Sequence, residues 1–255
     1  MILGYEMIFP QYEGNIPQIS ADQMVEVDRL MIDEYKIELI QMMENAGRSL
    51  AHLARKRFLN GNPHNKEVMI LAGIGGNGGG ALVCARRLHN YGAKVTIFLT
   101  NSEDIFQPVP ALQLEITHRM GIPIYQTNAL SSINSSDLII DGMIGYSLKG
   151  NPRDGAEKLI IWANSKNTPI LALDTPSGLD TTTGNTFNPV IRATATMTLA
   201  LPKIGLLSDH LNDIVGELYL ADISVPPSLY SLLSPPIQVG NIFEKSDIVN
   251  ILGTG

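Results

Sequence analysis

The residues most suited to chemistry form a glycine-rich segment, Gly73-Ile-Gly-Gly-Asn-Gly-Gly-Gly80, which follows a short apolar run. Glycine lets a backbone approach a ligand closely, so that N–H groups beside a helix N-terminus can bind phosphate. Gly73, Gly75 and Gly78 satisfy the G-x-G-x-x-G spacing, whereas the lysine of a Walker loop is absent. The segment predicts a phosphate-binding loop of a dinucleotide site. The alternative is a turn whose glycines only allow a helix to pack on a strand.

A second polar segment begins at Asp141, after the apolar run LII, and ends at Arg153. Its thirteen residues include glycines, a serine and two cations, which is more than a plain turn requires. The composition predicts a loop that closes over an anion, and a solvated surface loop is the alternative. Asp141 is a candidate site residue, because a carboxylate at a buried strand end needs a cation, a donor or a ribose to stay charged.

The third segment is Asp174-Thr-Pro-Ser-Gly-Leu-Asp180, which ends the apolar run PILAL. Pro176 fixes one φ and Gly178 frees another, so they predict a tight turn that presents the oxygens of Asp174 and Ser177. For Asp174 the alternative is a carboxylate that only caps the turn. A serine hydrolase is disfavoured, because Ser177 is not in a G-x-S-x-G pattern and no histidine is identifiable as its partner.

Six apolar runs after residue 66 must position these segments. They alternate with helical patterns at about 81–91, 111–120 and 156–165. The runs are VMILAG, KVTIFLT, DLIIDGM, PILALDT, ATATMTLAL and LYLADI. Nearly continuous apolar runs are typical of strands buried on both faces. Their alternation with helices predicts an α/β fold of three layers, a Rossmann-like, doubly wound and mostly parallel sheet, with a less regular edge at the last two runs.

The N-terminal region has a helical period. Apolar residues recur at spacings of three and four between about 20 and 59, which predicts two additional helices with Ser20 or Asp22 as a cap. We expect a single domain over 1–255, with a core at about 66–225 and a tail at 226–255. In doubly wound sheets, ligands bind where the carboxyl ends of the strands meet at a reversal of strand order. The three polar segments are therefore expected to converge.

Composition narrows the classes of function. The 255 residues are 44% hydrophobic and carry a net charge of −7, which argues against nonspecific nucleic-acid binding. The single Cys84 cannot form an internal disulfide, and no apolar run is long enough to span a membrane. We expect a cytoplasmic protein. A dehydrogenase is poorly supported, because Thr100 and Asn101 end the second run where an acidic ribose ligand belongs, and Glu103 and Asp104 come late.

Taken together, in this order and spacing, the motifs resemble those of the NAD(P)H-hydrate epimerase family, also called the YjeF N-terminal domain. The matching segments are Met43 to Gly47, Gly75 to Gly79, Asp141 to Arg153, Asp174 to Asp180, Leu201 to Gly205 and Ala221 to Ile223. The resemblance implies an isomerase that interconverts the R and S epimers of hydrated NADH and NADPH, and thereby repairs a damaged cofactor. It also implies a homodimer.

The resemblance also implies site residues. A potassium ion would be held by Asn77, Asp141 and Ser177, whose hard oxygens suit such a cation. The hydrated dinucleotide would contact Gly76, Asn77, Gly78, Gly79, Gly80, Gly145, Tyr146, Ser147, Leu148, Lys149, Gly150, Asn151 and Asp174. We hypothesise that Asp174 transfers the proton, as acid and then as base, when the hydroxyl on C6 of the nicotinamide ring leaves as water and water returns.

The glycine loop departs from the family pattern. The family loop usually reads Asn-Asn-Gly-Gly-Asp-Gly, whereas residues 76–81 of this chain read Gly-Asn-Gly-Gly-Gly-Ala, so that Gly80 stands at the place of the aspartate. Relatives with altered glycine loops serve as dimerisation modules. The second hypothesis is therefore a noncatalytic module that binds a dinucleotide or dimerises on a degenerate epimerase fold.

Overall fold

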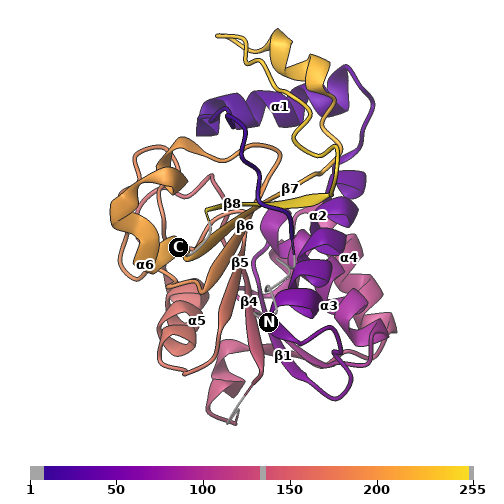
Figure 1. Cartoon of the computed structure of the whole chain (residues 1–255). Coiled ribbons are helices and arrows are strands. Elements are labelled where there is room, and N and C mark those ends of the chain that lie inside the picture. Colours follow the sequence, from indigo (N-terminus) through magenta and orange to yellow (C-terminus); the bar gives the residue numbers. More distant parts are fainter. Residues whose placement is uncertain (1–8, 133–135, 253–255) are drawn as a thin grey trace, which may run out of the picture.

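A single eight-stranded sheet forms the centre of the computed structural model, which describes residues 9–132 and 136–252 (Figure 1). The strand order is β3-β2-β1-β4-β5-β6-β7-β8. The strands are β1 (Glu67–Ala72), β2 (Lys94–Leu99), β3 (Ile124–Gln126), β4 (Leu138–Gly142), β5 (Ile170–Leu173), β6 (Ala195–Leu199), β7 (Glu217–Ala221) and β8 (Ile248–Leu252). All neighbouring pairs are parallel except β7 with β8.

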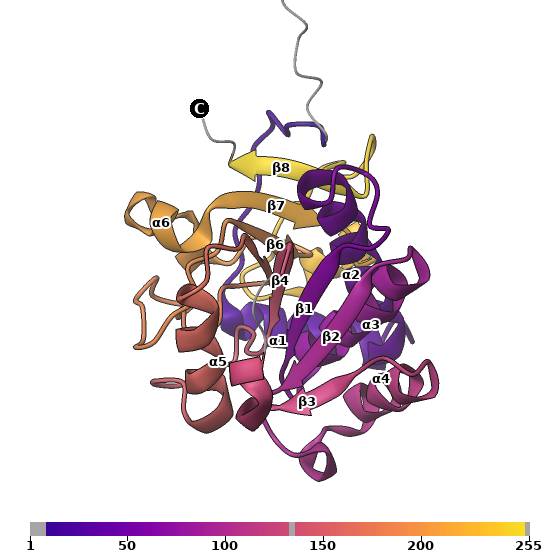
Figure 2. The same cartoon turned by 90° about the horizontal axis from the view of Figure 1, so that it is seen from below.

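Helices cover both faces of the sheet, so the expected three-layer α/β fold is confirmed (Figure 2). The α-helices are α1 (Ala21–Asp33), α2 (Leu39–Leu53), α3 (Gly76–Asn90), α4 (Pro108–Arg119), α5 (Asp154–Asn164) and α6 (Asn212–Val215). Successive strand residues point to opposite faces. Ile70 of β1 packs in one core cluster with Leu82 of α3, whereas Leu71 shares another with Leu159 of α5.

Short helices complete the chain. A π-helical turn, η1 (Ala54–Phe58), extends α2, and 3₁₀ turns are η2 (Glu103–Ile105), η3 (Thr127–Ser132), η4 (Ile204–Leu207), η5 (Asp209–Leu211) and η6 (Pro227–Leu232). Three of them, η4, η5 and α6, fill the connection between β6 and β7 that the sequence predicted to be irregular. None of the helices in the described part of the chain is long and apolar enough to cross a membrane.

Two N-terminal helices form as expected. Ser20 caps α1 in a capping box, in which its Oγ accepts a hydrogen bond from the Gln23 backbone N–H and the Gln23 side chain accepts one from the Ser20 N–H, both at 3.1 Å. Helix α1 packs against η6, whereas α2 packs along α3. The apolar face of α1 thus belongs to a cluster with residues beyond 225, for example Leu30 with Leu229.

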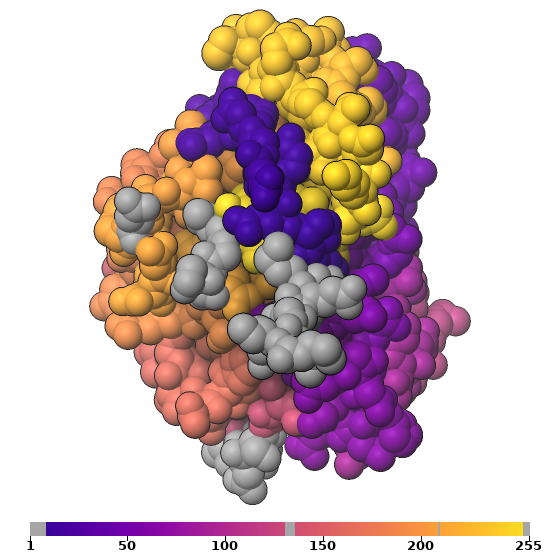
Figure 3. Space-filling model, in the orientation of Figure 1, coloured from indigo at the N-terminus to yellow at the C-terminus, as the bar shows by residue number. Residues whose placement is uncertain are grey.

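Two strands, β3 and β8, correspond to none of the six apolar runs. β3 is three residues long and its Tyr125 is 46% exposed, so its sequence lacks the apolar run that indicates a buried strand. β8 comes from the segment expected to be a tail, and it adds to β7 as an antiparallel edge strand. The N-terminal segment then pairs with β8 through Tyr12 and Asn250, and it lies on the surface beside the C-terminal residues (Figure 3).

Helix α3 starts earlier than the sequence predicted, at Gly76 instead of about residue 81. Four glycines are therefore helical despite their low helix propensity. Close packing is the reason: a Cβ at Gly78 would lie 1.7 Å from the Gly73 carbonyl oxygen, and one at Gly79 would lie 2.6 Å from Met43 Sδ. Tertiary contact thus overrides propensity, and it places the N-terminus of α3 against the end of β1.

We expect the substitution Gly78→Ala to destabilise the protein by about 3 kcal/mol, because overpacking against rigid backbone costs this much. Gly76→Ala is the matched control, since a Cβ at Gly76 would meet nothing within 4 Å. Urea denaturation of both variants measures the difference. Equal stability of the two variants would show that α3 does not approach β1 this closely.

Candidate functional site

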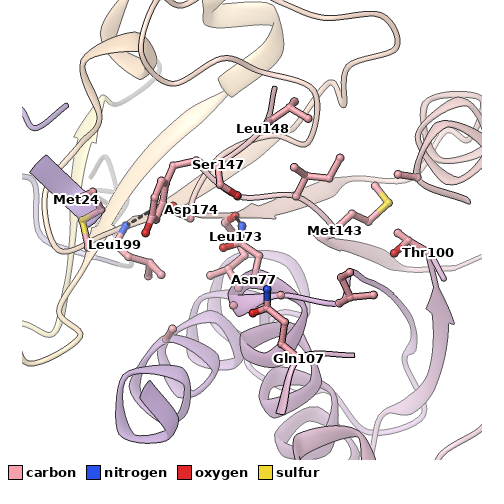
Figure 4. A pocket seen from close by; sticks show the side chains of 18 of the residues that line it. Met24, Asn77, Thr100, Gln107, Met143, Ser147, Leu148, Leu173, Asp174 and Leu199 are labelled. Carbon is pink, nitrogen blue, oxygen red and sulfur yellow. Dashed lines mark hydrogen bonds between the residues drawn. The ribbon is translucent and has the colours of Figure 1, made fainter. Parts of the chain in front are cut away.

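A cavity of about 790 Å³ opens beside the carboxyl ends of the central strands (Figure 4). Its wall comes from the β1–α3 junction, the loop after β4, the loop after β5, and the helices α1 and α2. This is the point where the strand order reverses between β1 and β4, the usual ligand site of a doubly wound sheet. In Figure 4, Asp174 lies at one end with Met24 and Leu199, and Thr100 lies toward the other.

Most of the predicted substrate-binding residues line this cavity. They are Gly76, Asn77, Gly145, Tyr146, Ser147, Leu148, Lys149, Asn151 and Asp174. Gly78, Gly79 and Gly80 do not; they are buried inside α3 against neighbouring protein atoms. Gly150 is also outside the lining and has a φ of +84°. The structure thus brings the three polar segments together but presents only the start of the glycine segment to the cavity.

Asp141 joins the loops after β4 and β5 behind the cavity wall. Its buried carboxylate accepts hydrogen bonds from the Ser177 N–H at 2.7 Å, the Ser177 hydroxyl at 2.6 Å and the Met143 N–H at 3.2 Å. Ser177 Oγ also accepts a bond from the Ile144 N–H at 2.9 Å. Burial raises the pKa of Asp141 to about 6, although the bonds from Ser177 favour the charged form. These contacts lock two loops in one arrangement.

Asn77, at the start of α3, reaches the same place. Its Nδ2 donates to the Leu173 carbonyl at 2.8 Å, and a Cβ at Gly145 would lie 2.8 Å from its Oδ1. The Asp141–Ser177 pair holds the neighbouring residue Ile144. The three residues predicted to share an ion therefore converge on one turn of the loop after β4.

Asp174 forms a buried ion pair with Lys203, a residue for which the sequence predicted no role. The side chains are 3% and 1% exposed. Asp174 also accepts hydrogen bonds from the Leu199 N–H at 3.2 Å and the Thr198 hydroxyl at 3.3 Å, and Lys203 Nζ donates to the Leu199 carbonyl at 3.0 Å. Lys203 belongs to Leu201-Pro-Lys-Ile-Gly205, one of the segments that match the family, and this match is the signal in the sequence that indicates a role for it.

The turn-capping alternative does not describe Asp174. Its partners belong to β6 and the segment after it, and its φ of +65° holds the backbone in the left-handed region. Asp180 instead caps the turn that follows, where it accepts hydrogen bonds from the Thr182 N–H at 2.8 Å and the Thr183 hydroxyl at 2.8 Å. Gly178 has the expected positive φ, at +103°.

A second carboxyl, Asp28 of α1, lines the same cavity. It accepts a hydrogen bond at 2.6 Å from the hydroxyl of Tyr146, which lies in the loop after β4. Burial raises the pKa of Asp28, and burial together with the Asp28 charge raises the pKa of Tyr146. The sequence gives no indication that Asp28 belongs to the site, because one acidic residue on an amphipathic helix has no distinguishing pattern.

The opposite end of the cavity lacks the acidic group of a dehydrogenase. Thr100 and Asn101, which follow β2, line the cavity and hydrogen-bond to each other at 2.8 Å. Glu103 lies outside the lining and contacts His118 at 2.9 Å. An acidic ribose ligand at the end of the second strand is thus absent from the lining.

The family model for YjeF-related protein N-terminus matches residues 39–205. The chain belongs to this family. It is 39% identical over 225 residues to an NAD(P)H-hydrate epimerase of Dehalogenimonas lykanthroporepellens. The aligned residues cover 88% of this chain and 89% of that protein. It is also 35% identical to a bifunctional NAD(P)H-hydrate repair enzyme Nnr of Moorella thermoacetica, over 83% of this chain and 41% of the longer protein.

The fold of this chain is also similar to that of a solved structure. The crystal structure of yeast ynu0 superposes with a TM-score of 0.78 at 24% identity, covering 92% of this chain and all of that one. At this identity the likeness concerns the fold alone. Within the YjeF-related family match, Asn77, Asp141, Asp174, Ser177 and Lys203 all lie inside residues 39–205, whereas Asp28 lies before it.

We expect Lys203→Met to reduce the free energy of unfolding by about 3–5 kcal/mol, because it leaves the buried Asp174 carboxylate without its cation. The double variant Lys203→Met/Asp174→Asn should recover part of this loss, since no unpaired charge remains. Urea denaturation of both proteins at neutral pH measures the two values. A single variant as stable as the wild type would contradict the buried pair.

Proposed function

We propose that the chain is an isomerase that interconverts the R and S epimers of hydrated NADH and NADPH. The observation that carries the proposal is Asp174, a carboxylate held by Lys203 in the wall of a cavity that a helix N-terminus also borders. The relatives named NAD(P)H-hydrate epimerase support it. A homodimer and a cytoplasmic location stay predictions.

The N-terminus of α3 provides the binding part of the site. Gly76 and Asn77 begin this helix and line the cavity, so unpaired backbone N–H groups and the positive end of the helix dipole lie beside it. A pyrophosphate is the group that this arrangement favours. With pyrophosphate there, the hydrated nicotinamide lies toward Asp174 and the adenosine toward Thr100. A cavity of about 790 Å³ falls in the usual range for a small-molecule or cofactor site.

The chemistry at the Asp174 end requires only proton movement. The hydrated ring carries a hydroxyl on C6 next to N1, and protonation of that oxygen lets it leave as water while the N1 lone pair forms an N1=C6 double bond. Water that returns to the other face gives the other epimer. Asp174 exchanges the proton with the leaving and the returning water, and general acid–base catalysis of this kind contributes about 10²- to 10⁴-fold.

The potassium ion is part of the proposal. Asn77, Asp141 and Ser177 supply an amide oxygen, a carboxylate and a hydroxyl around one turn, and hard oxygen donors of this kind suit potassium. Asp141 is buried without a basic side chain among its hydrogen-bond partners, so a cation would offset the cost of its charge. The ion would supply charge neutralisation and would help to order the loops.

The noncatalytic module is the second hypothesis, and the position of Gly80 bears on it. A Cβ at Gly80 would lie 2.9 Å from Leu173 Cδ2, so this position faces the packed region between α3 and β5. Gly80 does not line the cavity. A side chain at position 80 would meet Leu173 first, whereas Asn77 and Asp174 remain in the cavity lining, and this favours the epimerase.

We expect Asp174→Asn to lower the catalysed epimerisation rate by roughly 10²- to 10⁴-fold while dinucleotide binding stays nearly intact. The assay incubates mixed epimers of hydrated NADH with the protein and with a dehydratase that consumes only the S epimer. Asp180→Asn is the matched control, because it makes the same change in the same segment outside the cavity lining. An Asp174→Asn variant with the wild-type rate would refute the role of Asp174.

Wild-type protein that binds hydrated NADH but does not convert it would support the module instead. Binding is measured by calorimetry with the same epimer mixture, at a temperature where circular dichroism shows the protein folded.

Potassium is expected to stabilise the protein through binding to the native state. At a potassium concentration tenfold above Kd, linkage gives about 1.4 kcal/mol. The melting temperature in potassium chloride is compared with that in choline chloride at equal ionic strength. Ser177→Ala should reduce the difference, whereas Ser165→Ala, at an exposed helix end, should not. Equal melting temperatures in both salts would contradict the ion site.

A further inference from the structure

The Asp174 end of the cavity holds two carboxyl groups and one ammonium. Lys203 bonds directly to Asp174, and its positive charge also lowers the pKa of Asp28. Asp174, Asp28, Tyr146 and Lys203 all line the cavity. The groups come from four different elements, namely α1 and the segments after β4, β5 and β6.

The two carboxyl groups differ in their partners. Asp174 has the Lys203 ammonium and the Leu199 N–H among its partners. Asp28 has one hydrogen-bond partner among the described residues, the hydroxyl of Tyr146. Burial raises the pKa of Asp28, and the charge of Asp174 also raises it. Two carboxyls in one site with such different surroundings are typical of an acid and base pair.

Epimerisation has a stereochemical demand that one carboxyl does not meet directly. Water must leave one face of the ring and return to the opposite face. A single group would have to serve both faces, or the ring would have to turn over in the cavity. Asp28 belongs to α1, and Asp174 follows β5, so two separate elements each contribute a carboxyl to the lining of this end of the cavity.

We propose that Asp28 is a second catalytic residue, which exchanges a proton with the C6 hydroxyl on one face of the ring while Asp174 serves the other face. This inference rests on the proposed function. Protonated Asp28 gives its proton to the C6 hydroxyl, the C6–O bond breaks with its electrons on the departing water, and the N1 lone pair forms the N1=C6 bond.

Water then attacks C6 from the opposite face. Its lone pair forms the new C6–O bond, the N1=C6 π electrons return to N1, and Asp174 accepts the surplus proton. The net change is inversion at C6 and transfer of one proton from Asp28 to Asp174. The reverse turnover, or exchange with bulk water, restores the starting state. No oxidant or reductant is needed.

Asp28→Asn tests the inference. We expect kcat for epimerisation to fall by 10²-fold or more in both directions, with the affinity for hydrated NADH changed by less than threefold. Asp33→Asn is the matched control, because it makes the same change on α1 at a side chain that is 53% exposed and lies outside the cavity lining. It should retain the wild-type kcat. Asp28→Glu should recover part of the lost rate.

Two results would overturn the inference. One is an Asp28→Asn variant that keeps more than a third of the wild-type kcat, and the other is an Asp28→Asn variant whose affinity for hydrated NADH falls as much as its kcat. The latter would show that Asp28 only fastens the loop after β4. Wild-type protein without epimerase activity would overturn the proposed function as well, whereas an active wild type with an active Asp28→Asn variant overturns this inference alone.

The pH dependence of the rate gives a further test. The proton-donating step needs Asp28 protonated, and burial raises the pKa of Asp28. The wild-type kcat should therefore fall on the alkaline side as Asp28 loses its proton, and the residual kcat of Asp28→Asn should lack this fall. The titratable and charged groups around Asp28 are Tyr146, Lys203, Asp174 and Tyr230. An alkaline fall that is unchanged in Asp28→Asn would contradict the second carboxyl.

Discussion

The buried pair of Asp174 and Lys203 is the interaction on which the rest of the site depends. A carboxylate or an ammonium alone in this position costs several kcal/mol, so the chain must bring both to the same place. Asp174 ends β5 and Lys203 follows β6, and the parallel pairing of these strands sets their approach. Because Leu199 contributes both its N–H and its carbonyl, the pair is held by backbone as well as by charge. The cavity end therefore has a fixed polar group with little freedom to move.

The other end of the site is set by close packing. Gly78, Gly79 and Gly80 let α3 lie against the end of β1 and against α2, because a Cβ at each of them would meet backbone or a neighbouring side chain. Glycine is costly inside a helix, so its presence at several consecutive positions reflects contact. Asn77 then connects this helix to β5 through the Leu173 carbonyl, and Asp141 connects the loops after β4 and β5. The binding region and the proton-transfer region are thus parts of one hydrogen-bonded framework.

The N-terminal helices give this member of the YjeF-related family a wall that a plain doubly wound sheet lacks. α1 contributes Asp28 to the cavity, and α2 packs along α3. The C-terminal strand β8 and η6 pack against this region in turn, so both ends of the chain support one side of the site. Contacts between residues distant in sequence decide the shape of the cavity here, as the Tyr146 bond to Asp28 illustrates.

The sequence alone determined the doubly wound fold, because buried parallel strands leave near-continuous apolar runs, and it identified three polar segments that meet at the strand ends. It did not determine β3, which is only three residues long, or β8, whose short run Ile-Val-Asn-Ile-Leu lies in the segment expected to be a tail, or the start of α3, where packing outweighs propensity. Only the tertiary structure showed that Lys203 pairs with Asp174 and that Asp28 faces the same cavity. From the sequence alone, a lysine in a loop and an aspartate on a helix are expected to be solvated charges. The burial and the partners of Lys203 and Asp28 depend on segments that are distant in the sequence.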